Sequence, residues 1–284
     1  MLNLEKRMIL SVILNFTITL AEFIGGAISG SLALVSDAIH NFSDATSILG
    51  SYIAIRIGKR KKNERFTFGY KRAEILVAFV SSLTLLEVCL YLLIESFKRL
   101  SGPVEIKSDL MLAVALIGFF ANVFTAILLH RHASESMNVR AAYLHVLSDS
   151  VSSAGVVIGA LIIRAFNVTF IDSVITIIIA LYISKESLKI LKECGNILME
   201  CSPNIDFKEI KREIESIEGV KDAHHFHAWR IGEKDLYFEC HVKVKDMPIS
   251  KAQKIKDEIV EILRKHGITH MNVQIEHHCN QFSC

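Results

Sequence analysis

The stretch LALVSDAIHNFSDATSILG, residues 32–50, places a histidine and a carboxylate, His40 and Asp44, four positions apart in an apolar segment of membrane length. Residues four apart share one face of a helix, so this imidazole and this carboxylate can point at one place. An ionisable side chain at membrane depth costs roughly 2.5–3.5 kcal/mol even on the insertion scale, so such residues indicate a function.

The same pattern recurs in NVRAAYLHVLSDSVSSAG, residues 138–155, as His145 and Asp149. Two such helices side by side supply two nitrogens and two oxygens, a complete tetrahedral set for Zn²⁺. We therefore predict an intramembrane metal site made of the two pairs. Serine and glycine also recur at equal offsets in both stretches, and small residues let membrane helices approach closely. The two helices are expected to pack against each other there.

Apolar residues make up 51% of the 284-residue chain and concentrate before residue 192. About 20 such residues cross a bilayer as a helix. The first segment is too long for a signal peptide and lacks a clear cleavage site. Acids within the segments, Glu22 and Asp172 among them, are interpreted as interhelical hydrogen-bonding partners or edge residues. We predict six spanning helices, at 8–28, 32–57, 73–97, 109–130, 138–163 and 170–192.

The placement of charge predicts the orientation in the membrane. The link at 58–72 is rich in lysine and arginine, whereas the links on the opposite side are poorer in both. Short basic loops stay in the cytoplasm. Both termini are therefore expected in the cytoplasm, in a multi-pass protein of the cell membrane. The six cysteines do not form a secreted disulfide framework, since five would lie on the reducing side.

After residue 192 the pattern changes to that of a small soluble domain, which divides the chain into 1–200 and 201–284. Helices are expected from 207, with Asp206 as the cap, and from 250, with Ser250 and Gln253 as a capping box. Strands are expected at 220–231, 236–244 and 268–275. This order predicts an α+β domain with an antiparallel sheet and helices on one face. So small a domain has a thin core, and pairing with a second copy would help to stabilise it.

Three motifs resemble the cation diffusion facilitator family: GSLALVSDAIH at 30–40 followed by Asp44, FGYKRAE at 68–74, and HAW at 227–229. The resemblance covers nearly the whole chain. It implies six membrane helices with a ferredoxin-like cytoplasmic domain, a homodimer formed through that domain, and export of divalent metal in exchange for protons. A His-Asp pair on both helices is similar to the zinc-transporting branch.

The resemblance also implies a regulatory zinc site in the cytoplasmic domain. Its expected ligands are His227 and His241, completed by Glu276 or His278. The tail with His277, Cys279 and Cys284 could hold soft metal, or could be a non-functional end; both readings stay open.

The chain departs from the family pattern in two loops. Residues 58–72 contain no histidine, aspartate or cysteine, so no second metal site is expected in that loop. The loop near His130 and His132 is short, which indicates a prokaryote-like form. The role of Asp37, three residues before His40, stays open. It could be a partner that holds an imidazole, a stop on the proton or metal path, or a helix-start residue.

The sequence thus predicts a secondary active transporter that exports zinc, with cadmium, cobalt or iron as alternatives, by alternating access. Its partners would be metal ions, protons, the lipid bilayer and a second copy, with no nucleic acid and no cofactor beyond zinc. One alternative is a membrane zinc sensor whose site is structural. An intramembrane metallohydrolase is disfavoured because no His-Glu-x-x-His occurs, so we do not expect an enzyme.

Overall fold

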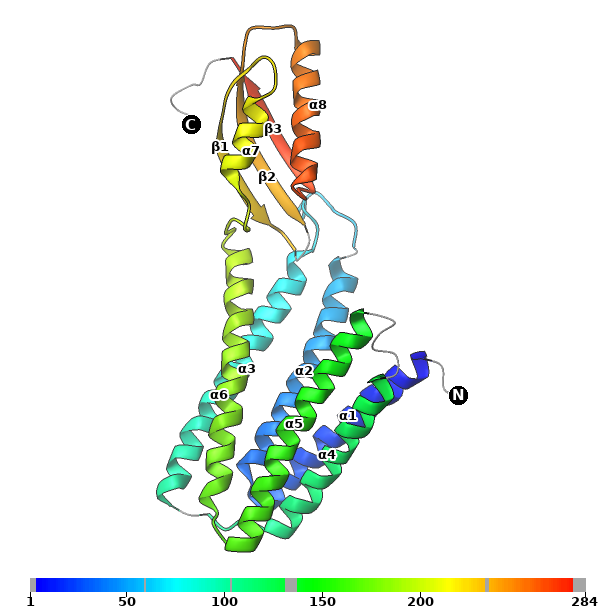
Figure 1. The fold of residues 1–284 in the computed structure, drawn as a ribbon, viewed down its shortest axis with the longest axis vertical. Coiled ribbons are helices and arrows are strands. Elements are labelled where there is room, and N and C mark those ends of the chain that lie inside the picture. Colours follow the sequence, from blue (N-terminus) through cyan, green and yellow to red (C-terminus); the bar gives the residue numbers. More distant parts are fainter. Residues whose placement is uncertain (1–3, 59, 103, 131–136, 233–234, 278–284) are drawn as a thin grey trace. The chain divides into compact units, whose positions relative to one another are not determined.

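The computed structural model describes residues 4–58, 60–102, 104–130, 137–232 and 235–277 (Figure 1). The chain forms two compact units. The first combines Met1–Tyr52 with Val80–Leu191, and the second combines Ile53–Phe79 with Lys192–Cys284. The expected boundary at residue 200 stays a prediction, because the second unit also includes Ile53–Phe79, which contains the basic link at 58–72.

Six long helices account for the first two-thirds of the described chain, and each predicted span falls within one of them (Figure 1). They begin and end close to the expected positions. Their bounds are α1 Leu4–Ser29, α2 Leu32–Gly58, α3 Arg72–Ser101, α4 Ser108–His130, α5 Met137–Phe166 and α6 Phe170–Leu198.

Three stretches among the described residues are long and apolar enough to cross a membrane: Arg72–Ser101, Ser108–Ile127 and Tyr143–Phe166. Phe16–Ser29 is a shorter apolar helix. Large apolar side chains also face outward from the helices, for example Phe120, which is 62% exposed. Such exposure fits a lipid environment, in which apolar surface carries no penalty. The count of six spans remains a prediction.

The start of α2 is fixed by a carboxylate from α6. Asp172 accepts hydrogen bonds from the backbone N–H groups of Leu32 (2.8 Å) and Ala33 (3.2 Å), and also from the Ser31 hydroxyl. The first N–H groups of a helix have no partner within it, and a carboxylate there also matches the helix dipole. Asp172 is thus an interhelical partner, as expected, and it anchors the helix that carries His40.

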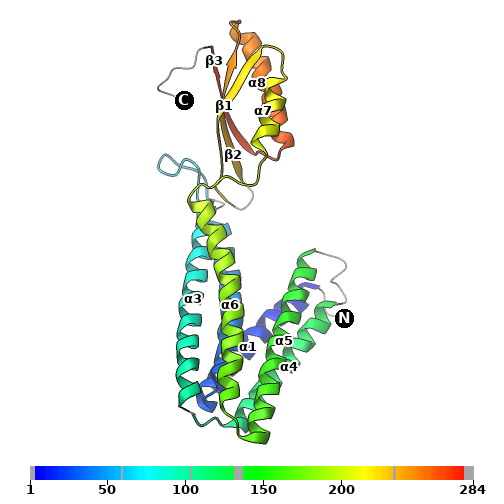
Figure 2. The same cartoon turned by 60° about the vertical axis from the view of Figure 1, so that its left-hand side comes forward.

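The second unit holds a mixed three-stranded sheet with two helices on one face (Figure 2). The order along the chain is α7 Phe207–Glu215, β1 Val220–Arg230, β2 Leu236–Val244, α8 Ile249–Lys265 and β3 His270–Glu276. The strands β1 and β2 are antiparallel, but β3 runs parallel to β2. The expected purely antiparallel sheet is therefore wrong, because α8 is a crossover that returns the chain before β3 begins.

The alternation of apolar and polar side chains along β2 gives the sheet a core face and a second, polar face. Phe238, Cys240 and Val242 are buried in one cluster with Ile214 of α7 and Ile259 of α8. Successive strand side chains point to opposite faces, so Glu239 and His241 lie on the face away from the helices. That polar face carries the histidines of the domain.

The two predicted helix caps differ in outcome. Asp206 accepts hydrogen bonds from the backbone N–H groups of Lys208 and Glu209, which confirms that cap. The capping box at Ser250 is wrong, since α8 begins at Ile249 and Pro248, the residue before it, makes no side-chain cap hydrogen bond.

Candidate metal centres

The two His-Asp pairs of the first unit meet between α2 and α5. His40 Nε2 lies 3.6 Å from Asp44 Oδ2 and 3.8 Å from Asp149 Oδ1. His145 Nε2 lies 3.4 Å from Asp44 Oδ2 and 3.8 Å from Asp149 Oδ2. The Nε2 atom of each imidazole therefore faces both carboxylates.

These separations suit a shared metal ion better than direct hydrogen bonds. Ligand atoms 2.0–2.1 Å from a tetrahedral Zn²⁺ lie about 3.3 Å from one another. Within the described residues, Asp44 Oδ2 and both Asp149 carboxylate oxygens are buried without a hydrogen-bond partner. Buried carboxylate oxygens are rarely left so, and a cation would satisfy them.

Access to this cluster is one-sided. The side chain of Asp149 is 1% exposed, whereas that of His145 is 44% exposed. The exposed fractions of the His40 and Asp44 side chains, 19% and 30%, fall between these extremes. The cluster is therefore more open at His145 than at Asp149.

Asp37 ties the two ligand-bearing helices together. Its carboxylate accepts hydrogen bonds from the Ser152 and Ser153 hydroxyls of α5, both at 2.8 Å. His40 Nδ1 has no hydrogen-bond partner among the described residues, so Asp37 does not hold that imidazole. Ser152, one of the recurring serines, and its neighbour Ser153 thus connect α5 to α2 through Asp37. Gly155 does not, since nothing lies within 4 Å of a Cβ built there.

Sequence reasoning did not identify Asn41 as part of this polar interior. Its side chain donates to Glu22 of α1 at 3.2 Å, and both residues are buried. Glu22 is thus an interhelical partner of Asn41, the residue that directly follows the His40 ligand. The signal available in the sequence was an amide residue, Asn41, directly beside the predicted ligand His40.

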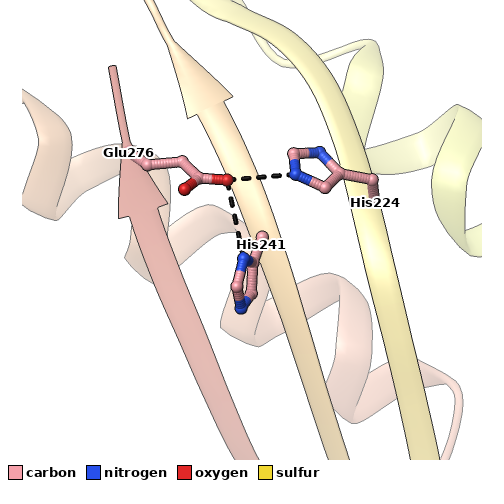
Figure 3. A group of neighbouring side chains, drawn as sticks. All are labelled: His224, His241 and Glu276. Carbon is pink, nitrogen blue, oxygen red and sulfur yellow. Dashed lines mark ion pairs between the residues drawn. The ribbon is translucent and has the colours of Figure 1, made fainter. Parts of the chain in front are cut away.

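A second cluster gathers on the polar face of the sheet, one residue from each strand (Figure 3). Glu276 Oε1 lies 3.0 Å from His224 Nε2 and 3.6 Å from His241 Nδ1. His241 is only 5% exposed, and its Nδ1 has no hydrogen-bond partner among the described residues. Two imidazoles and a carboxylate on three strands form an incomplete zinc ligand set.

A carboxylate behind His224 orients its ring. Asp222 Oδ2 lies 2.8 Å from His224 Nδ1, which leaves Nε2 to face Glu276. Burial, the largest single effect, acts to raise the pKa of Asp222, but the Lys211 hydrogen bond at 3.0 Å, the Lys211 charge and smaller contributions together outweigh it, so the net pKa of Asp222 is lowered. An ionised carboxylate that holds the far nitrogen of a ligand histidine is a common support of metal sites.

Two of the four expected cytoplasmic ligands, His241 and Glu276, come together, and His224 stands where His227 was expected. In the sheet register His224 pairs with His241, whereas His227 pairs with Glu239. His278, Cys279 and Cys284 lie outside the described residues. Cys240 is no ligand, since it faces the core and burial raises its thiol pKa to about 12.

Comparison with known proteins agrees with this arrangement. Residues 8–199 match the family described as the cation efflux transmembrane domain, and residues 202–278 match the cation efflux protein cytoplasmic domain. A helical unit with an internal ligand cluster, followed by a small α+β domain, is thus the architecture of a membrane transporter. The chain belongs to the cation efflux family.

Its relatives are similar over nearly their full length. The "Cadmium, cobalt and zinc/H(+)-K(+) antiporter" of Bacillus subtilis is 35% identical over 99% of this chain and 93% of its own. The "Zinc transporter ZitB" of Pectobacterium atrosepticum is 36% identical over 99% of this chain and 88% of its own. The "Metal cation efflux system protein CzcD" of Cupriavidus metallidurans is 35% identical over 96% of this chain and 86% of its own.

Proposed function

We propose that this protein exports zinc, and cadmium or cobalt with it, from the cytoplasm in exchange for protons. The observation that carries the proposal is that the Nε2 atoms of His40 and His145 lie 3.4–3.8 Å from carboxylate oxygens of Asp44 and Asp149. Among the described residues, Asp44 Oδ2 and both Asp149 oxygens are buried without a hydrogen-bond partner. His40, Asp44 and Asp149 form the compact group, with ligand atoms within 4.8 Å of one another, and His145 stands beside it. The names of the relatives support the same metals and the proton exchange. As a transporter, the protein needs no catalytic residue and no cofactor.

The donor set explains the choice of metal. Two imidazoles with two carboxylates suit zinc, whereas oxygen-only sites suit manganese, magnesium or calcium. Iron, cobalt and cadmium compete by similar chemistry, so supply in the cell decides among them.

The same four side chains couple metal to protons. A histidine must be neutral and an aspartate ionised to bind metal, so metal entry releases protons. Protons that arrive from the far side displace the metal in return. The one-sided exposure of the cluster fits one half of an alternating-access cycle, in which the His145 side is open and the Asp149 side closed.

The cytoplasmic cluster has a regulatory role in this proposal. His224, His241 and Glu276 bind zinc when the cytoplasmic concentration rises, with His278 as a further candidate ligand. Binding joins all three strands of the sheet and stabilises the pairing of two copies through this domain. Both termini are cytoplasmic in the cell membrane, as the exposed basic residues of the link support: Arg60, Lys61, Lys62 and Arg65.

The test is zinc flux into proteoliposomes under an imposed pH gradient, with wild type compared with Asp149→Asn. Asp109→Asn is the matched control, since Asp109 is an exposed carboxylate on α4 that pairs with Arg164. We expect gradient-driven flux in wild type and in the control, and none in Asp149→Asn. Tight zinc binding lost in Asp149→Asn, with no flux in any variant, would instead favour the membrane zinc sensor.

A further inference from the structure

The basic link between α2 and α3 folds into a compact turn. The side-chain oxygen of Asn63 accepts hydrogen bonds from the backbone N–H groups of Arg65 (3.0 Å) and Phe66 (2.8 Å), and its amide nitrogen donates to the Tyr70 hydroxyl at 3.1 Å. The turn closes where Gly69 N–H donates to the Phe66 carbonyl at 3.0 Å, with a φ of 81° that favours glycine. The basic side chains of the link therefore extend from a defined backbone.

The exposed cations of this turn have no acidic partner. None of the four forms an ion pair with another described residue, and Glu64 is the one acid between them. The free set is Arg60, Lys61, Lys62 and Arg65. Exposed charges of one sign, gathered on one short stretch, attract a ligand of the opposite sign.

A cavity of about 750 Å³ opens beside the turn, within the second unit. Ligand sites commonly measure about 300–1,000 Å³. Arg65 and Phe66 of the turn line it, together with Leu76 of α3 and Trp229 of β1. The guanidinium carbon of Arg65 lies 5.8 Å from the centroid of the Phe66 ring, which is within the range of a cation–π contact. Arg65 is thus positioned at the cavity by its neighbour.

The two acids that line the cavity are already engaged. Glu200 pairs with Arg72 at 2.6 Å, and Glu239 accepts a hydrogen bond from Asn272 at 3.2 Å. They therefore leave the charge of Arg65 free for a ligand.

The cavity also belongs to the surface of the membrane. The helix α3 is long and apolar enough to cross a bilayer, and its first turns line the cavity. The lining side chains of Phe66, Phe68 and Leu76 are 42%, 51% and 50% exposed. Aromatic side chains are enriched where a spanning helix leaves the hydrocarbon. Apolar side chains beside free cations match a molecule that has an anionic head and a hydrocarbon tail.

We propose that this turn and its cavity bind one anionic phospholipid of the phosphatidylglycerol type, with the headgroup phosphate at Arg65 and Lys62 and an acyl chain along Phe66, Phe68 and Leu76. Guanidinium groups bind phosphate through paired hydrogen bonds. The stem of Lys62 lies beside the cavity, since its Cγ is 3.7 Å from a Cβ built at the lining residue Gly69.

A lipid fits better than free phosphate because so much of the lining is apolar. Clusters of four or more basic residues next to a spanning helix are typical of sites for anionic lipids. The proposal depends neither on the transported ion nor on the two metal clusters.

The test uses Trp229, the one tryptophan of the chain, as a reporter in the wall of the cavity. The full-length protein in uncharged detergent is titrated with phosphatidylglycerol that carries bromine in its acyl chains, and in parallel with brominated phosphatidylcholine. Bromine quenches the fluorescence of a tryptophan that it approaches closely. We expect quenching at a lower mole fraction of phosphatidylglycerol than of phosphatidylcholine.

The variants Lys62→Gln and Arg65→Gln should each weaken the binding of phosphatidylglycerol by about fivefold and leave that of phosphatidylcholine unchanged. Arg65→Lys keeps the charge and should keep the preference. Lys254→Gln, at an exposed lysine of α8, is the control and should behave as wild type.

Equal quenching by the two lipids, or none by either, would overturn the proposal. The same holds for an unchanged preference in both Lys62→Gln and Arg65→Gln, and for a loss in Arg65→Lys as complete as in Arg65→Gln. Recovery of the emission in excess inorganic phosphate would assign the site to free phosphate, which also overturns it.

Discussion

At the scale of single residues, the identity of the donor atom decides which ion is bound. Each imidazole of the membrane cluster faces two carboxylates, so the replacement of one histidine changes a quarter of the ligand set without changing its geometry. Oxygen ligands favour harder ions. His145 is the more exposed of the two histidines and tolerates a shorter side chain with the least rearrangement.

His145→Asp should therefore lower the preference for zinc over manganese by at least about tenfold, which corresponds to about 1.4 kcal/mol. The measurement is the competition of Mn²⁺ against Zn²⁺ in binding and in proteoliposome flux. His130→Asp, at the exposed end of α4, serves as the control. An unchanged preference in His145→Asp would show that this residue does not select the metal.

The pairing of Lys211 with Asp222 gives the cytoplasmic domain a pH-dependent contribution to stability. The hydrogen bond with Asp222 raises the pKa of Lys211; for Asp222, burial acts to raise the pKa, but the hydrogen bond and charge of Lys211 with smaller contributions together lower it. Because the pKa of Asp222 is lower in the folded state, its ionised carboxylate stabilises the fold above the pKa of the unfolded state. This stabilisation is lost as the pH falls through the pKa of the folded state. Because the pKa of Lys211 is higher in the folded state, its charged amine stabilises the fold below the pKa of the unfolded state. This stabilisation is lost as the pH rises through the pKa of the folded state.

Lys211→Ala should accordingly destabilise the domain between about pH 5 and 9 by roughly 0.2–1 kcal/mol, since both side chains are partly exposed. The difference from wild type should shrink below about pH 3, where the carboxylate is protonated. Trp229 is the one tryptophan of the chain and lies in β1, so its fluorescence reports unfolding of this domain. A destabilisation that persists unchanged in acid would assign the loss to packing instead.

At the scale of helices and strands, the sequence predicted elements well and their pairing less well. Apolar periodicity located α1 to α6, because long amphiphilic or apolar runs leave few alternatives. It could not predict that β3 is parallel to β2, which depends on the direction of the α8 crossover. His224 rather than His227 joins the cluster because His224 is the residue of β1 that pairs with His241, and apolar periodicity does not fix this register.

The cap that Asp172 provides to α2 is testable at this scale. Asp172→Asn keeps the shape of the side chain but removes the charge that faces the Leu32 and Ala33 N–H groups. Hydrogen bonds to charged groups contribute about 1.5–3 kcal/mol, so the thermal midpoint in detergent should fall and zinc affinity at the α2 site should weaken with it. Asp109→Asn should change neither. A lower midpoint with unaltered zinc affinity would show that the α2 start does not position His40.

At the scale of the whole molecule, the proposed transport cluster and the proposed sensing cluster lie on different compact units. Each cluster uses two histidines, but the first has two carboxylates and the second has one within the described chain. The difference suits their roles, since a transport site must release its ion and a sensor must equilibrate with the cytoplasm.

The double variant His241→Asn with Glu276→Gln should abolish the activation of flux by low cytoplasmic zinc while leaving zinc binding at the membrane cluster intact. It should also weaken the zinc-dependent association of two copies, which light scattering in detergent would measure. Lys254→Asn with Glu258→Gln, two exposed residues of α8, is the matched control. Identical flux curves for the double variant and wild type would remove the regulatory role.

The cap on α2 also sets an order of events during synthesis. The first N–H groups of the helix that carries His40 and Asp44 find their partner on α6, about 140 positions later in the chain. The ribosome must therefore synthesise α6 before the start of α2 can make these hydrogen bonds. Until then, the growing chain holds His40 and Asp44 on a helix that lacks this cap. We therefore expect zinc binding at the membrane cluster to mature only once α6 is in place.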